Sequence, residues 1–183
     1  MSIIIPTRIF LTKGYGQHKE KLASLEQALR MAGIAPFNLV KVSSIFPPGC
    51  RLVSRAEGLK HLSPGQITFL VMSECATDEA HRQISSSVGV AVPNDIDRYG
   101  YLSEHHSFGQ DEQEAGQYAE DLAAWMLATT LGQEFDPDQI WNEERSVYEL
   151  GDNITVKTRN VTVTVNGKKG HWTTAIAAAV LIP

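Results

Sequence analysis

The stretch Asn38-Leu39-Val40-Lys41-Val42-Ser43-Ser44-Ile45-Phe46-Pro47-Pro48-Gly49-Cys50 is the strongest constraint on how this chain folds. Its first part, Asn38 to Val42, alternates polar and aliphatic residues, which is typical of a β-strand. Pro47 and Pro48 lack backbone donors and fix φ at about −65°, so the strand ends or turns close to the pair Ser43-Ser44. Taken alone, this pair is an ordinary polar strand end before a Pro-Gly turn.

Length and composition favour one globular domain. With 183 residues the chain can bury roughly 70% of its unfolded surface in a single core. Its two cysteines, Cys50 and Cys75, form no disulfide framework, which favours a reducing compartment. The net charge of −5, with no basic run longer than Lys168-Lys169, argues against nucleic acid as a partner. Without a signal peptide or an 18-residue apolar run, we expect a cytoplasmic protein with no membrane contact.

Hydrophobic periodicity predicts a strand–helix–strand opening. A strand at Arg8 to Lys13 is closed by Gly14-Tyr15-Gly16, and a helix ending at Gly33 follows. The predicted buried face of this helix consists of Leu22, Leu25, Ala28, Leu29 and Ala32. A nucleotide loop at Gly14-Tyr15-Gly16 is weakly supported because the third glycine is missing, so the helix is better explained as the cover of a sheet.

A second long helix is predicted at Glu112 to Leu131, ended by Gly132. Its predicted buried face consists of Tyr118, Leu122, Trp125, Met126 and Thr129. The remaining strands are predicted at Gln66 to Glu74, Ile84 to Val92, Tyr99 to His106, Ser146 to Leu150, Ile154 to Val165 and His171 to Ile182. The turn at Asn166 to Gly170 suggests that the last two strands form a hairpin. This pattern indicates an α+β sandwich.

The segment Val42 to Gly49, with Asn38 upstream, resembles the self-cleavage site of the pyruvoyl-dependent arginine decarboxylases, and a similar spacing covers the rest of the chain. The resemblance implies that the single domain 1–183 is cleaved between Ser43 and Ser44, giving a β chain of residues 1–43 and an α chain of residues 44–183. Ser44 would become a covalent pyruvoyl cofactor. The implied fold is a four-layer αββα sandwich with mixed or antiparallel sheets.

The resemblance also implies the reaction and the assembly. A ketone at position 44 would form a Schiff base with L-arginine and accept electrons as CO2 leaves, giving agmatine without a separate cofactor. Polyamine biosynthesis is the expected context, and a homotrimer or dimer of trimers with sites between subunits is the expected assembly. Two alternatives stay open: a decarboxylase of another amino acid, such as aspartate, and a non-catalytic, uncleaved trimeric homologue.

Cleavage requires the Ser44 hydroxyl to attack the preceding carbonyl through a tetrahedral oxyanion. We expect backbone strain of ~1–3 kcal/mol at the scissile peptide. A donor to the oxyanion, worth ~2.7–4 kcal/mol, is also needed, and the Asn38 amide and the Ser43 hydroxyl are the candidates. Asn38 and Ser44 are six residues apart, so the strand has to bend to bring them together.

Three further residues complete the predicted site. Glu104 resembles the family's proton donor, a role that calls for a buried carboxylic acid; the alternative is a surface carboxylate beside His105-His106. Glu26 resembles the family's ligand for the guanidinium group, although we expect aspartate there, and Ile45 is expected to contact the substrate. Alternatively, Glu26 is a solvated residue paired with Arg30. No metal site is predicted, because the adjacent His105-His106 face opposite sides of a strand.

Overall fold

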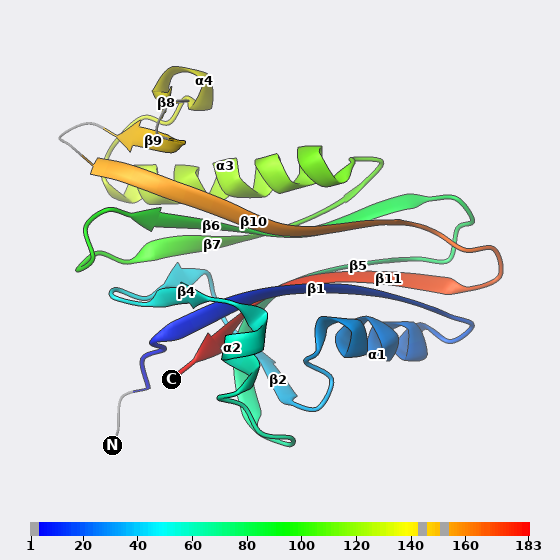
Figure 1. Cartoon of the computed structure of the whole chain (residues 1–183). Coiled ribbons are helices and arrows are strands. Elements are labelled where there is room, and N and C mark those ends of the chain that lie inside the picture. Colours follow the sequence, from blue (N-terminus) through cyan, green and yellow to red (C-terminus); the bar gives the residue numbers. More distant parts are fainter. Residues whose placement is uncertain (1–3, 143–145, 151–153) are drawn as a thin grey trace.

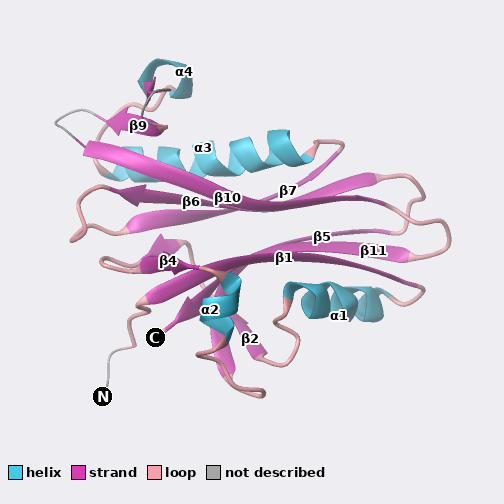
Figure 2. Ribbon diagram, viewed as in Figure 1, coloured by secondary structure: helices cyan, strands magenta, loops and turns pink. Residues whose placement is uncertain are grey.

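A computed structural model describes residues 4–142, 146–150 and 154–183. Within these ranges the chain forms two sheets that lie face to face, with helices on both outer faces (Figure 1). The five-stranded sheet, called sheet A, has the order β2-β5-β11-β1-β4, and the six-stranded sheet, called sheet B, has the order β3-β7-β6-β10-β9-β8. The helix–sheet–sheet–helix layering confirms the predicted αββα sandwich of the α+β class (Figure 2).

The element bounds are as follows. Sheet A contains β2 (Asn38–Lys41), β5 (Ile67–Thr77), β11 (Trp172–Ile182), β1 (Arg8–His18) and β4 (Arg51–Val53). Sheet B contains β3 (Ile45–Phe46), β7 (Gly100–Phe108), β6 (Gln83–Pro93), β10 (Ile154–Asn166), β9 (Val147–Leu150) and β8 (Trp141–Asn142). The helices are α1 (Lys21–Ala32), α2 (Arg55–Leu59), α3 (Glu112–Thr130) and α4 (Pro137–Ile140). Helices α1 and α2 cover sheet A, and α3 covers sheet B (Figure 1).

Glycines let α1 lie directly on β1. A Cβ atom at Gly14 would collide with the backbone carbonyl of Ala28, and one at Gly16 would collide with that of Ser24. The strand therefore continues through these glycines to His18, and the prediction that it closes at Gly14-Tyr15-Gly16 was wrong. The glycines serve close helix packing rather than a nucleotide loop. Gly33, with φ of +79°, ends the helix as predicted.

The last two strands belong to different sheets. β11 lies in the centre of sheet A between β5 and β1, whereas β10 pairs with β6 and β9 in sheet B. The predicted hairpin was therefore wrong, and the turn after Asn166 connects the two sheets. The physical reason is the unbroken apolar run from Ala175 to Ile182, which is buried on both faces and needs a layer on each side.

Small residues, rather than aromatic ones, form the buried face of α3. The residues that pack on sheet B are Ala115, Gly116, Ala119, Ala123, Ala124, Leu127 and Ala128. Tyr118 and Trp125, predicted to be buried, are each 49% exposed. Where α3 passes over β6, a Cβ atom at Gly89 would collide with the Ala119 carbonyl. Small side chains thus let the helix lie close to the sheet, and the large ones point away from it.

Candidate functional site

The pair Ser43-Ser44 lies where the chain passes from sheet A to sheet B. On one side, the Val42 N–H donates to the Leu70 carbonyl of β5 at 2.9 Å, which continues the β2–β5 pairing in sheet A. On the other side, the Leu102 N–H of β7 donates to the Ser44 carbonyl at 2.7 Å, and β3 then pairs with β7 in sheet B. The peptide bond between the serines is thus held by a different sheet on each side.

Ser44 is the central residue of a three-residue turn. The Ile45 N–H donates to the Ser43 carbonyl oxygen at 3.1 Å, which is an i to i+2 bond of the γ-turn type. Ser43 is exposed and Ser44 is partly buried. Between Asn38 and Val53, only Gly49 has a positive φ. The backbone strain expected at the serine pair therefore does not take the form of a left-handed conformation at Ser43 or Ser44.

Glu104 reaches across the gap between the sheets beside this turn. It lies on β7, two residues after Leu102 and on the same face of the strand. One carboxylate oxygen accepts a hydrogen bond of 3.1 Å from the Met72 N–H of β5. If the parallel pairing of β2 with β5 continued, the Met72 N–H would donate to the Val42 carbonyl. Glu104 therefore replaces the hydrogen bond that would extend β2. Glu104 is exposed in this chain, whereas we expected a buried acid.

Other cross-links hold β7 over β5 at this edge. The Ser73 hydroxyl donates to the His105 carbonyl at 2.6 Å, and the Cys75 thiol lies 4.0 Å from the Ser107 carbonyl oxygen. Together with the bond from Met72 to Glu104, these contacts align residues 72, 73 and 75 of β5 with residues 104, 105 and 107 of β7. This alignment fixes where Glu104 lies relative to the serine pair.

Asn38 lies at the opposite end of β2 from the serines. Its side-chain amide donates to the Gly65 carbonyl at 2.7 Å, and its N–H donates to the Gln66 carbonyl at 2.9 Å. About 13 Å of strand separates it from Val42, at ~3.3 Å per residue. One chain therefore does not bring Asn38 to Ser44, and its role as an oxyanion donor stays a prediction that requires β2 to bend.

Glu26 also lies apart from the serine pair. It is on α1, which packs on β1 and β11, whereas Ser44 follows the edge strand β2. The carboxylate accepts a hydrogen bond of 2.8 Å from the Arg30 side chain. This is the ion pair named above as the alternative to a role in guanidinium binding. It borders an open groove of about 600 Å³ on the outer side of α1, whose apolar lining includes Leu22, Leu25 and Leu29. The Glu26 carboxylate thus lies beside an apolar groove.

Two cavities of about 250 Å³ each lie against the segment after the turn. Phe46 and Cys50 border both cavities, and Lys157 and Arg159 border one of them. Burial raises the pKa of the Cys50 thiol to about 11, so this thiol is protonated at neutral pH. Sequence reasoning missed these neighbours and the backbone donors Leu102 and Met72, because their positions depend on how the two sheets pack face to face.

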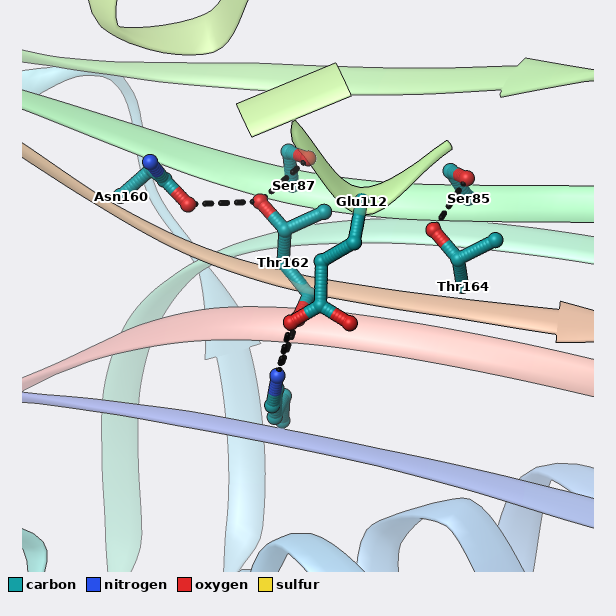
Figure 3. Close-up of polar contacts among 7 residues, drawn as sticks. Ser85, Ser87, Glu112, Asn160, Thr162 and Thr164 are labelled. Carbon is teal, nitrogen blue, oxygen red and sulfur yellow. Dashed lines mark hydrogen bonds and ion pairs between the residues drawn. The ribbon is translucent and has the colours of Figure 1, made fainter. Parts of the chain in front are cut away.

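A second group of hydroxyl residues lies on the outer face of sheet B (Figure 3). Ser85 bonds Thr164 at 2.6 Å, and Ser87 bonds Thr162 at 2.8 Å. Near them, Lys13 of β1 donates to Glu112 at 2.5 Å and to the Thr162 carbonyl at 2.6 Å. These hydroxyls satisfy one another between β6 and β10, so the group is explained as structural.

The part of the chain that the structure describes holds neither a metal-binding cluster nor a membrane-spanning helix. No group of three or more histidine, cysteine, aspartate or glutamate side chains among them converges in a metal-binding arrangement. No helix in the same part of the chain is long and apolar enough to cross a membrane.

Comparison with known proteins gave consistent matches. The family model for pyruvoyl-dependent arginine decarboxylase matches residues 8–183. A probable pyruvoyl-dependent arginine decarboxylase of Chloroherpeton thalassium is 57% identical over 180 residues, and one of Chlorobium limicola is 56% identical over 179 residues. The pyruvoyl-dependent arginine decarboxylase of Nitrosopumilus maritimus is 53% identical over 180 residues. Each alignment covers 98% of both chains.

Proposed function

Because this chain belongs to the family of pyruvoyl-dependent arginine decarboxylases, we propose that it is a self-processing enzyme that converts L-arginine to agmatine and CO2. The pyruvoyl group that the family name implies is made from Ser44. The observation that carries this assignment is the position of the Ser43-Ser44 bond, which is held by sheet A through Val42 and by sheet B through the Ser44 carbonyl.

Self-processing uses the atoms of the two serines and one water. The Ser44 Oγ bonds to the Ser43 carbonyl carbon, the bond from that carbon to the Ser44 nitrogen breaks, and the hydroxyl proton moves to this nitrogen. Loss of the Ser44 α-proton then expels the Ser43 carboxylate and leaves dehydroalanine. Its imine tautomer takes up water and releases ammonia, which leaves the ketone.

The fold supports retention of the cleaved fragment. In residues 1–43, β1 pairs with β11 along its whole length, from Arg8 to His18, and α1 lies on that pair. Cleavage after Ser43 removes none of these contacts. We therefore expect residues 1–43 and 44–183 to stay together as one folded unit.

The residues around Ser44 fit a pyruvoyl group. The Leu102 N–H holds the carbonyl that follows the Ser44 α-carbon, and this carbonyl is retained after processing. When present, the group supplies a ketone that condenses with the substrate amine and accepts the electron pair released with CO2. Glu104 lies on the same strand as Leu102 and returns a proton to the substrate α-carbon.

Substrate binding involves Glu26 and Ile45. The Glu26 carboxylate pairs with the substrate guanidinium in place of Arg30, and Leu22 and Leu29 flank the aliphatic part of arginine. Ile45, 40% exposed beside Ser44, contacts the substrate at the reacting end. Because Glu26 and Ser44 lie apart in one chain, we propose that subunits of a homotrimer, or of a dimer of trimers, complete the site. A cytoplasmic role in polyamine biosynthesis belongs to the same proposal.

Intact mass under denaturing conditions tests the proposal. The wild-type chain is expected to give two species, residues 1–43 and 44–183, with a carbonyl on the larger one that reacts with hydroxylamine. Ser44→Ala is expected to stay one species of 20.1 kDa and to release no CO2 from arginine. The matched variant Ser43→Ala keeps the nucleophile and should still cleave.

Other outcomes would reject all or part of the proposal. A wild-type chain that stays whole and lacks a reactive carbonyl would favour a non-catalytic homologue. A cleaved chain that releases CO2 from aspartate but not from arginine would favour the other substrate class.

A further inference from the structure

The register of β3 on β7 leaves one backbone donor beside the serine pair unused by the sheet. Ile45 lies opposite Tyr101, and the Leu102 N–H bonds the Ser44 carbonyl just outside this pair. In an antiparallel ladder, this pattern marks Ile45 and Tyr101 as a non-hydrogen-bonded pair. The Ile45 N–H therefore points away from β7 and is free for another acceptor.

That acceptor is the Ser43 carbonyl oxygen, 3.1 Å from the Ile45 nitrogen. This oxygen belongs to the carbonyl that Ser44 attacks in the proposed processing. We propose that the backbone N–H of Ile45 is the oxyanion donor for self-cleavage, an inference that rests on the function proposed above. As the Ser44 Oγ bonds to the carbonyl carbon, the π electron pair moves to this oxygen. The donor is in place before the charge develops, which makes such donors effective.

The side-chain candidates considered from the sequence fit this role less well. The Asn38 amide donates to Gly65 at the far end of β2. The Ser43 side chain is exposed and makes no hydrogen bond in the part of the chain that the structure describes. Among the described residues, Ile45 is the one donor found for the Ser43 carbonyl oxygen.

Pro47 and Pro48 hold this arrangement in register. In the observed pairing, Phe46 lies opposite Gly100 in a hydrogen-bonded pair, and the ladder then ends because Pro48 has no N–H to donate. A slip by one residue would require Ile45 and Pro47 as ladder donors, and Pro47 lacks the hydrogen. The prolines thus favour the register in which the Ile45 N–H faces the Ser43 carbonyl.

Replacing only the N–H group tests the inference. Cell-free translation can place the α-hydroxy acid analogue of isoleucine at position 45, which changes the N–H to an ester oxygen and keeps the side chain. We expect the rate of self-cleavage to fall by about 10²–10³-fold. Intact mass spectrometry over time measures this rate. Ile45→Pro is expected to slow it too, although proline also restricts the Ser44 backbone. The isoleucine chain made by the same cell-free route keeps the N–H and is the control for the cleavage rate.

The controls separate this inference from the function on which it rests. Circular dichroism of each variant should match that of Ser44→Ala, the uncleaved reference fold. An ester variant that cleaves as fast as the isoleucine chain made in the same way would overturn the role of the Ile45 N–H and leave the proposed function standing. A wild-type chain that never cleaves would overturn both.

Discussion

The Glu104 carboxylate accepts the hydrogen bond from the Met72 N–H that would otherwise continue the pairing of β2 with β5. One side chain of sheet B thus marks the point where β2 leaves sheet A. Leu102, two residues earlier on the same strand, holds the Ser44 carbonyl. Because residues two apart on a strand lie about 7 Å from each other, β7 sets the spacing between the carboxylate and the residue proposed to become the cofactor.

Glu104→Gln separates the chemistry of Glu104 from its structural contact. The glutamine oxygen can still accept from Met72, so we expect the fold and self-cleavage to be kept. The proposed proton donor is lost, so CO2 release from arginine should fall about 10²–10⁴-fold. The measurement is CO2 release by protein whose cleavage has been verified by mass. Glu112→Gln, which alters a distant carboxylate bonded to Lys13, is the matched control. Unchanged turnover in Glu104→Gln would remove Glu104 from the mechanism.

Local periodicity could predict the α+β class, whereas the four-layer αββα order was implied only by the family resemblance, and the pairing of the strands could not be predicted. Ile154 to Val165 was identified as a strand because its alternation is local, whereas its partner β6 lies some seventy residues earlier in the chain. The short elements β3, β4 and α2 carry too few residues for a periodic signal. The buried face of α3 was misjudged because alanine and glycine give a weak hydrophobic signal, although they allow the closest packing.

The site could be predicted only as far as the resemblance named its side chains. Ser44 and Glu104 lie at one edge of the sandwich, but the sequence cannot show that two sheets hold the bond between Ser43 and Ser44. The groups that do so are backbone atoms of Leu70 and Leu102, and any residue type supplies those atoms. The separation of Glu26 from Ser44 was equally hidden, because it depends on which face of sheet A the helix covers.

Gly16→Ala should destabilise the protein strongly. The added Cβ atom would collide with the Ser24 carbonyl of α1, and backbone cannot move aside as a flexible side chain can. We expect the free energy of unfolding to fall by about 3 kcal/mol, the upper end of typical overpacking costs. Urea denaturation provides the measurement. Gly109→Ala is the control, since its Cβ meets no atom within 4 Å and only its φ of +87° is unfavourable, a cost of about 1–2 kcal/mol. Equal losses would show that α1 does not lie this close to β1.

Cys50 should make stability depend on pH above neutrality. Burial raises the pKa of its thiol from 9.0 to about 11 in the folded chain. The unfolded chain therefore loses this proton first as the pH rises, so the free energy of unfolding should decrease between pH 9 and about 11. Urea denaturation over this pH range measures the decrease. In Cys50→Ser, the free energy of unfolding should fall less steeply with pH. Rapid alkylation of folded Cys50 by iodoacetamide at pH 7.5 would contradict the raised pKa.

Glu26→Gln tests whether the groove on α1 holds the guanidinium group. The change keeps the length of the side chain and removes its charge, so a charge-assisted contact worth about 1.5–3 kcal/mol is lost. We expect the KM for arginine to rise about 10–100-fold, while cleavage after Ser43 is unaffected. Steady-state CO2 release gives KM, and intact mass reports the cleavage.

Two further variants serve as controls. Glu26→Asp keeps a carboxylate and introduces the residue that we expected from the family, so it should retain most of the affinity for arginine. Arg30→Gln removes the cation that now occupies Glu26 and should not raise KM, because the carboxylate becomes free for the substrate. If Glu26→Gln and Glu26→Asp both bind arginine as the wild type does, the guanidinium ligand lies elsewhere and α1 serves only to cover sheet A.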